Sequence, residues 1–132
     1  MIAAVETADG VYTIDLETEE VLGLEQGATV PLVPAPSVPL PRVVAAAAAG
    51  STVVAVVDRR PPLIVSYDAG RTWTEAGGGL PPGRAIAIDE ENPDFVLYAA
   101  RNRLFLSENG GRFWRALAPE LPEILALAVT EA

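Results

Sequence analysis

Arginine side chains are the groups in this sequence best suited to binding chemistry, because the chain of 132 residues contains neither histidine nor cysteine. A guanidinium group binds carboxylate, phosphate or sulfate through paired hydrogen bonds. Six arginines lie in turns or links between apolar runs: Arg42, Arg59, Arg60, Arg84, Arg101 and Arg103. They predict a basic face that binds a small anionic or peptide ligand. The alternative is that these side chains are solvated and paired with neighbours such as Asp58 and Glu120.

The missing residue types exclude several kinds of site. Without histidine and cysteine, the usual zinc ligands and the Ser-His-Asp and Cys-His mechanisms are absent. We therefore expect no metal site and no cofactor. Catalysis stays open and is less favoured than binding.

The charge balance restricts the partners and the location that we expect. Eighteen acidic residues against nine arginines give a formal net charge of −9, which disfavours nucleic acid and anionic membranes as partners. The longest apolar run, residues 43–49, is far shorter than a membrane helix requires. Residues 1–9 lack the basic region of a secretory signal peptide. A cytoplasmic location is the resulting expectation.

One eight-residue motif occurs twice. Residues 66–73, SYDAGRTW, recur as residues 107–114, SENGGRFW, so that Ser, Gly, Arg and Trp repeat at a spacing of 41 residues. Short apolar runs repeat around each copy and are separated by turns rich in Gly, Pro and Asn. Such runs are typical of strands. Four strands in about 40 residues predict an all-β fold of the β-propeller type, with one blade per repeat.

The first motif resembles the Asp-box, also called the bacterial neuraminidase repeat, of sialidases, sortilin-type receptors, xyloglucanases and photosystem II assembly factors. The resemblance implies that the motif forms the hairpin between the third and fourth strands of a blade and has a structural role away from the axis. The matching positions are Ser66, Asp68, Gly70, Thr72 and Trp73 in the first copy, and Ser107, Asn109, Gly111 and Trp114 in the second.

Each motif residue has a physical task. Asp68 can accept backbone N–H bonds in the turn, Gly70 can adopt a conformation denied to other residues, and Trp73 can bury a large surface. The second copy has Asn109 in place of Asp and Phe113 in place of Thr. We expect fewer side-chain hydrogen bonds there, and we expect both tryptophans to be buried.

The order of apolar runs predicts a single unit, residues 1–132, with five parts. Residues 1–26 form a blade that lacks its first strand, residues 27–41 a proline-rich link, residues 42–83 and 84–123 two blades, and residues 124–132 a closing strand. The strand missing at the start is thus found at the end, as in propellers that complete one blade from both termini.

Three blades per chain are too few to close a propeller, which usually has four to eight. Two chains would supply six blades, the number that sialidase folds use. We therefore expect a homodimer that closes one six-bladed ring, with the closing strand exchanged between protomers. The alternative is that the chain is a piece of a longer propeller.

The proline-rich link, residues 27–41, allows two interpretations. It can be a stiff spacer between blades, which we favour, or a loop laid over one face as a lid or as a docking peptide for a proline-binding partner.

The function expected from these observations is non-catalytic binding or scaffolding, with the arginines near the axis of the ring. The alternative is a small sialidase-like glycoside hydrolase. The chain lacks the Arg-Ile-Pro motif of sialidases, and no carboxylate pair for glycoside hydrolysis stands out by its spacing.

Overall fold

The protein, described here by a computed structural model of residues 1–31 and 33–130, consists of three antiparallel sheets of four strands each. The described residues contain no helix, and hence none that could cross a membrane. The expectation of an all-β protein is confirmed. The first sheet has the strand order β12-β1-β2-β3, the second β4-β5-β6-β7, and the third β8-β9-β10-β11.

The strands follow the apolar runs of the sequence. In the first sheet they are β1 Ile2–Thr7, β2 Gly10–Asp15, β3 Glu20–Gln26 and β12 Ile124–Thr130. In the second sheet they are β4 Val43–Ala49, β5 Thr52–Val57, β6 Leu63–Ser66 and β7 Thr74–Ala76. In the third sheet they are β8 Ala85–Ile88, β9 Val96–Ala99, β10 Arg103–Ser107 and β11 Arg115–Glu120.

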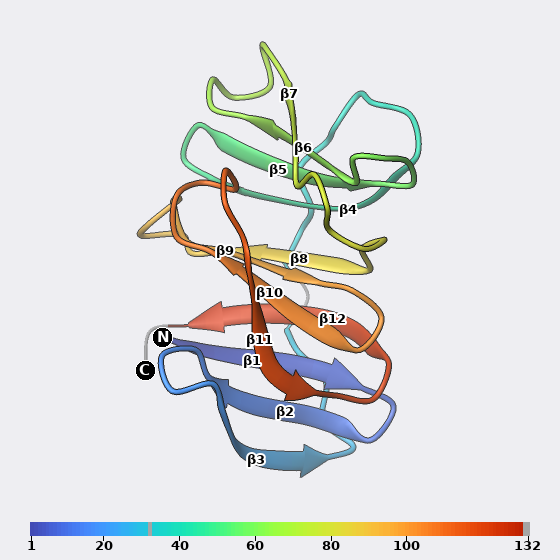
Figure 1. Ribbon diagram of the computed structural model, residues 1–132, viewed down its shortest axis with the longest axis vertical. Helices are drawn as coiled ribbons and strands as arrows, with labels where there is room; N and C mark the ends of the chain where they lie inside the picture. The colour runs from blue at the N-terminus through green and yellow to red at the C-terminus, as the bar shows by residue number, and fades with distance from the viewer. Residues whose placement is uncertain (32, 131–132) are drawn as a thin grey trace.

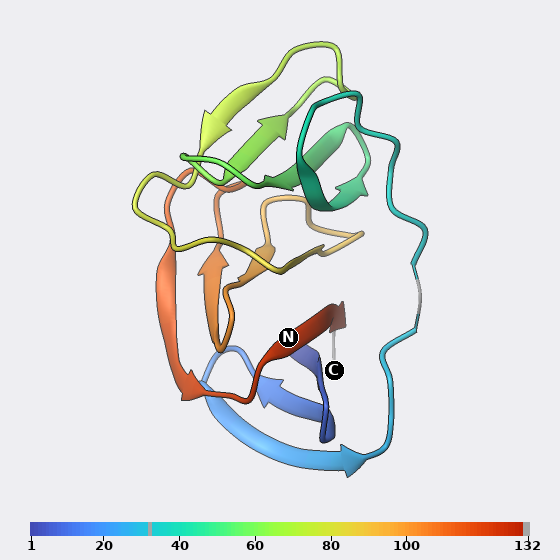
Figure 2. The ribbon, with the colours of Figure 1, turned by 90° about the vertical axis from the view of Figure 1, so that its right-hand side faces the viewer.

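The three sheets are stacked in a row, with the third sheet in the middle (Figure 1). Strand β8 contacts both β4 and β12. These three strands each form one edge of their sheet, and we call them the first strands, so the first strands of the three sheets lie beside one another. The link between β3 and β4 runs the length of this row, from the first sheet back to the second (Figure 2).

Two apolar cores hold the row together. Between the first and third sheets, the fully buried side chains include Val5, Ile14, Leu104 and Leu117. Along a strand such as β1, fully buried and partly buried side chains alternate, because every second side chain of a strand points to the same face.

The second core lies between the second and third sheets and is centred on Tyr98, which is fully buried. Its ring makes edge contacts with Phe105 and Trp114 at centroid distances of 6.2 and 5.8 Å. The Tyr98 hydroxyl donates a hydrogen bond of 2.6 Å to the carbonyl of Pro81. This bond satisfies the one polar atom of a large buried side chain.

Strand β12 completes the first sheet of its own chain. It pairs antiparallel with β1, with Ile2 opposite Thr130 and Val5 opposite Leu127. The expected exchange of this strand between protomers is not seen in this one-chain structure, in which the chain returns to its own N-terminal strand and covers an unpaired edge within one protomer. The last two residues of the expected closing strand, 131–132, lie outside the described residues.

The first turn motif, residues 66–73, is a hairpin closed by side-chain bonds. The Asp68 carboxylate accepts hydrogen bonds from the Thr72 N–H at 2.8 Å, the Thr72 hydroxyl at 2.6 Å and the Ser66 hydroxyl at 2.8 Å. Gly70 has φ +88°, in the region that favours glycine. The Thr72 hydroxyl, the Thr72 N–H and the Ser66 hydroxyl together lower the pKa of Asp68 to about 2.

The second turn motif, residues 107–114, has the same frame, with one bond fewer to the side chain of residue 109, as expected. It has two bonds that the first motif lacks, because Arg112 Nη1 donates to the Asn109 carbonyl and Trp114 Nε1 donates to the Gly111 carbonyl, each at 2.9 Å. Asn109 accepts hydrogen bonds from the Phe113 N–H and the Ser107 hydroxyl, each 2.9 Å long. The bond that Thr72 makes through its hydroxyl has no counterpart, because Phe113 stands at that position. The two motifs also contact each other, since the Tyr67 hydroxyl donates to the Gly110 carbonyl at 2.8 Å.

The two motif tryptophans occupy equivalent places but are not fully buried. A Cβ atom added to Gly70 would lie 3.5 Å from the Trp73 ring, and one added to Gly111 would lie 3.6 Å from the Trp114 ring. Both tryptophans are only half-buried, so the expectation of buried rings is wrong. Each ring lies over the glycine of its own turn, and Trp114 also packs against Tyr98 at the border of the second core.

Candidate functional site

A groove of about 790 Å³ runs along β4, β8 and β12. Consecutive residues of all three strands line it: 45–48, 85–88 and 125–130. Because successive side chains of a strand point to opposite faces, consecutive lining residues mean that the strand edges face the groove. The volume lies within the usual range for small-molecule sites.

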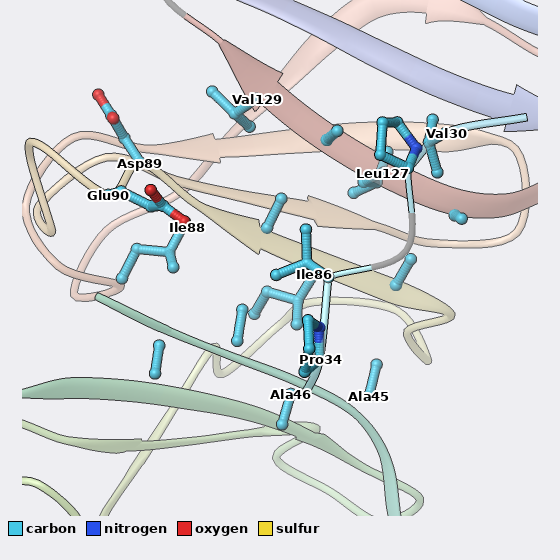
Figure 3. A pocket seen from close by; sticks show the side chains of 18 of the residues that line it. Val30, Pro34, Ala45, Ala46, Ile86, Ile88, Asp89, Glu90, Leu127 and Val129 are labelled. Atoms are coloured by element: carbon cyan, nitrogen blue, oxygen red, sulfur yellow. The ribbon is translucent and has the colours of Figure 1, made fainter. Parts of the chain in front are cut away.

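The side chains along the middle of the groove are apolar, and many of them are alanines. Alanine side chains of β4, including Ala45 and Ala46, face Ile86 of β8 and Leu127 of β12 across it (Figure 3). Small side chains leave room for a ligand to approach the strand backbones closely.

The two ends of the groove carry opposite charge. Arg84 lines it next to the start of β8, and Asp89, Glu90 and Glu91 line it beyond the end of β8. Asp89 is 7 % exposed, and its Oδ1 accepts a hydrogen bond of 3.1 Å from the Glu91 N–H. Its Oδ2 is buried and has no hydrogen-bond partner among the described residues. A buried carboxylate oxygen without a donor is costly, which marks this end as a place for a ligand's donor.

The proline-rich link forms one wall of the groove. Val30, Pro31, Val33, Pro34 and Pro36 line it, and Val30 is buried, with its N–H donating to Glu6 Oε1 of β1 at 2.8 Å. The link thus lies over one part of the groove and reaches further than a spacer between blades would need to. Residue 32 of the link lies outside the described residues.

The six arginines expected to bind anions lie at the end of the sheets where β4 and β8 begin. A smaller pocket of about 230 Å³ is lined by Arg59, Arg60 and Gly83, the neighbour of Arg84. The Arg42 carbonyl accepts a backbone hydrogen bond of 2.9 Å from Asp58, which precedes Arg59. Arg101 and Arg103 flank the turn between β9 and β10 at the same end.

Most of these guanidinium groups already have partners. Arg59 pairs with Glu75 at 3.1 Å, and Arg84 and Arg101 share Glu123 at 3.2 and 3.4 Å. Arg103 Nε donates to the Leu117 carbonyl at 3.0 Å. Arg42 and Arg60 are exposed, and within the described part of the chain neither forms an ion pair. The pairs are exposed, which is the arrangement that contributes least to stability.

The tyrosine hydroxyls of the second and third sheets are engaged in structural bonds. Burial raises the pKa of Tyr98 to about 12, and Tyr67 is bonded to the second turn motif. The carboxylates that line the groove, Asp89, Glu90 and Glu91, are neighbours in one turn, whereas glycoside hydrolysis needs two carboxylates that face each other across the substrate.

Among residues 1–31 and 33–130 there is no group of three or more acidic side chains placed to hold a metal ion. No known protein-family model matches the chain, and a comparison with curated proteins finds no significant match.

The groove is the part of the site that the sequence did not predict. Its signal is the run of five alanines, 45–49, in a strand that the sequence places first in its sheet. Ala45, Ala47 and Ala49 belong to the second core or pack against it, and the small side chains along this edge strand also leave space beside it.

Proposed function

We propose that this chain is a non-catalytic binding or scaffolding protein of the β-propeller class, and that it takes its ligand in the groove along β4, β8 and β12. Three four-stranded sheets with neighbouring first strands support the class, together with the repeated turn motif that resembles the Asp-box. The observation that carries the binding function is the groove itself, with apolar walls and a volume of about 790 Å³.

The arginine-rich end gives this proposal its anion preference. Arg84 lines the groove, and Arg59, Arg60, Arg101 and Arg103 lie at the same end. An anion there competes with Glu75 and Glu123 for guanidinium groups that are exposed. A ligand with an apolar body and one anionic group fits both features.

A probe of that chemistry is anilinonaphthalene sulfonate, whose fluorescence rises in an apolar site. We expect it to bind the wild type, to bind the Ala46→Trp variant much more weakly because the new ring fills the groove, and to bind Arg84→Gln more weakly because the sulfonate loses a partner. Ala116→Trp is the matched control, because Ala116 lies exposed on β11. Equal binding by the wild type and Ala46→Trp would contradict the proposal.

The anion preference has its own measurement. Sulfate or phosphate should raise the thermal stability of the wild type, since a ligand of the native state alone stabilises it. Glutamine at Arg59, Arg60, Arg101 and Arg103 together should remove this response. An unchanged response in that variant would show that the arginines bind no anion.

The ring itself is completed, in this proposal, by a second copy of the chain. The row of three sheets is half of a six-bladed ring, and each chain closes its own first sheet. The outer faces of the first and second sheets would then pack against the partner. Light scattering at micromolar concentration should give the mass of a dimer, and a monomer would refute the ring while leaving the groove in place.

A further inference from the structure

Three strand edges face the groove without strand partners. Within the described residues, β4 pairs only with β5, β8 only with β9, and β12 only with β1. An edge strand presents a row of N–H and C=O groups that an added extended chain can pair with. The groove therefore offers hydrogen bonds to a peptide main chain along its whole length.

The side chains leave room for such a chain to approach. Along β4, five of seven residues are alanine, so a backbone can come close to this edge. The protein's own link already runs beside these strands, because Val30, Pro31, Val33 and Pro34 form one wall of the groove. Prolines lack the N–H that pairing requires, so the link leaves these edges open to a partner.

Charge sets the direction of the peptide. Arg84 at one end and Asp89, Glu90 and Glu91 at the other favour a chain whose positive end lies at the acidic turn. Asp89 lies beyond Ile88 at the end of the groove, with Val129 of β12 across from it (Figure 3). Its unpaired Oδ2 is withdrawn from both solvent and the groove, so a donor in the groove reaches it only when the acidic turn shifts to admit the donor.

We infer that the groove binds an extended, apolar peptide segment whose ammonium group is held by Asp89. This inference rests on the proposed function, because it uses the same groove, and it adds the class of ligand and its orientation. The main chain of the peptide pairs with the edge of β4, its small apolar side chains pack on the alanine-lined wall, and its positive end supplies the donor that Asp89 lacks.

The test uses a synthetic peptide of alternating Val and Thr with a free N-terminus, seven residues long to match β4. Its N-acetylated form serves as the matched ligand without the charge. Hydrogen bonds to charged groups are the stronger kind. Acetylation should therefore weaken binding and raise the dissociation constant at least about tenfold. Isothermal titration calorimetry with the full chain measures both.

Asp89→Asn should remove this difference between the two peptides, whereas Glu108→Gln, which alters an exposed carboxylate outside the groove, should retain it. Because acetylation changes the ligand alone, the wild type tests the inference even where Asp89→Asn folds poorly. A simple amine such as butylamine should bind far more weakly than the peptide.

The failures of the inference and of the proposed function differ. Equal binding of the two peptides, or equal binding of butylamine and the peptide, would overturn the inference while dye binding to the groove persisted. If Ala46→Trp leaves the binding of both dye and peptide unchanged, the groove is not the binding site, and the inference fails with it.

Discussion

The pairing of β12 with β1 predicts the product of an engineered disulfide. Ala4 and Ala128 are partners across these strands, and both are half-buried. Directly opposed residues in antiparallel strands have Cα separations of roughly 4.5–5.5 Å, which a disulfide can span. The natural chain has no cysteine, so Ala4→Cys/Ala128→Cys should oxidise to one bond within each chain.

The magnitude follows from the loop that the bond closes. That loop has about 125 residues, and the chain-entropy model gives roughly 5 kcal/mol for loops of this length. For a chain of this size, that gain corresponds to a rise in Tm of roughly 15 °C, reduced by any strain in the bond.

A non-reducing gel, intact-mass spectrometry and thermal melts with and without reductant measure the outcome. The oxidised protein should migrate as a monomer, and reductant should return its Tm to that of the wild type. Ala4→Cys/Ala126→Cys is the control, because Ala126 lies opposite Glu6 and this diagonal pair is too far apart for the bond. A covalent dimer as the main product would refute closure within one chain and restore strand exchange.

The remaining predictions concern the turns and the second core. Trp114→Ala should lower the free energy of unfolding by about 2–3 kcal/mol in denaturant titrations, because Trp114 is half-buried against Tyr98. This loss is somewhat smaller than for a fully buried aromatic ring, and an unchanged free energy of unfolding would contradict this packing. Asp68 has a pKa lowered to about 2, so its contribution to stability is present above about pH 4 and is lost as the pH falls toward 2; Asp68→Asn should flatten this part of the stability profile, and an unchanged profile would exclude Asp68 as its source. Gly83→Ala should destabilise by about 1–3 kcal/mol, because the added Cβ would lie 2.5 Å from the Tyr98 hydroxyl, whereas Gly78→Ala meets nothing within 4 Å; similar melting temperatures for these two variants would argue against the contact.

The secondary structure could be predicted because local signals decide it. Short apolar runs between Gly and Pro turns have one reasonable interpretation as strands, and the motif at 66–73 places its hairpin through bonds between neighbouring residues, such as Asp68 with Thr72. Strand β12 was also expected where it is found, because the run at 124–129 is apolar and follows a complete set of four strands.

The partner of β12 could not be predicted, because it depends on how far the link between β3 and β4 reaches. Composition shows that this link is stiff, whereas its path along the row of sheets depends on contacts between distant residues, such as the Val30 N–H with Glu6. The groove escaped prediction for the same reason, since its three walls come from residues 45–48, 85–88 and 125–130. The half-burial of Trp73 and Trp114 is likewise set by the rim of the sheets and not by the motif.

Because β12 pairs with β1, the order of the strands in space is a circular permutation of their order along the chain. Ile2 lies opposite Thr130, so a short peptide could join the two ends, and the chain could instead be opened inside the proline-rich link. Such a circular permutant would begin at β4 and run through the second, third and first sheets in turn, with every sheet built from four consecutive strands. Its groove would lose the wall that the link provides, while the edges of β4, β8 and β12 would keep their places.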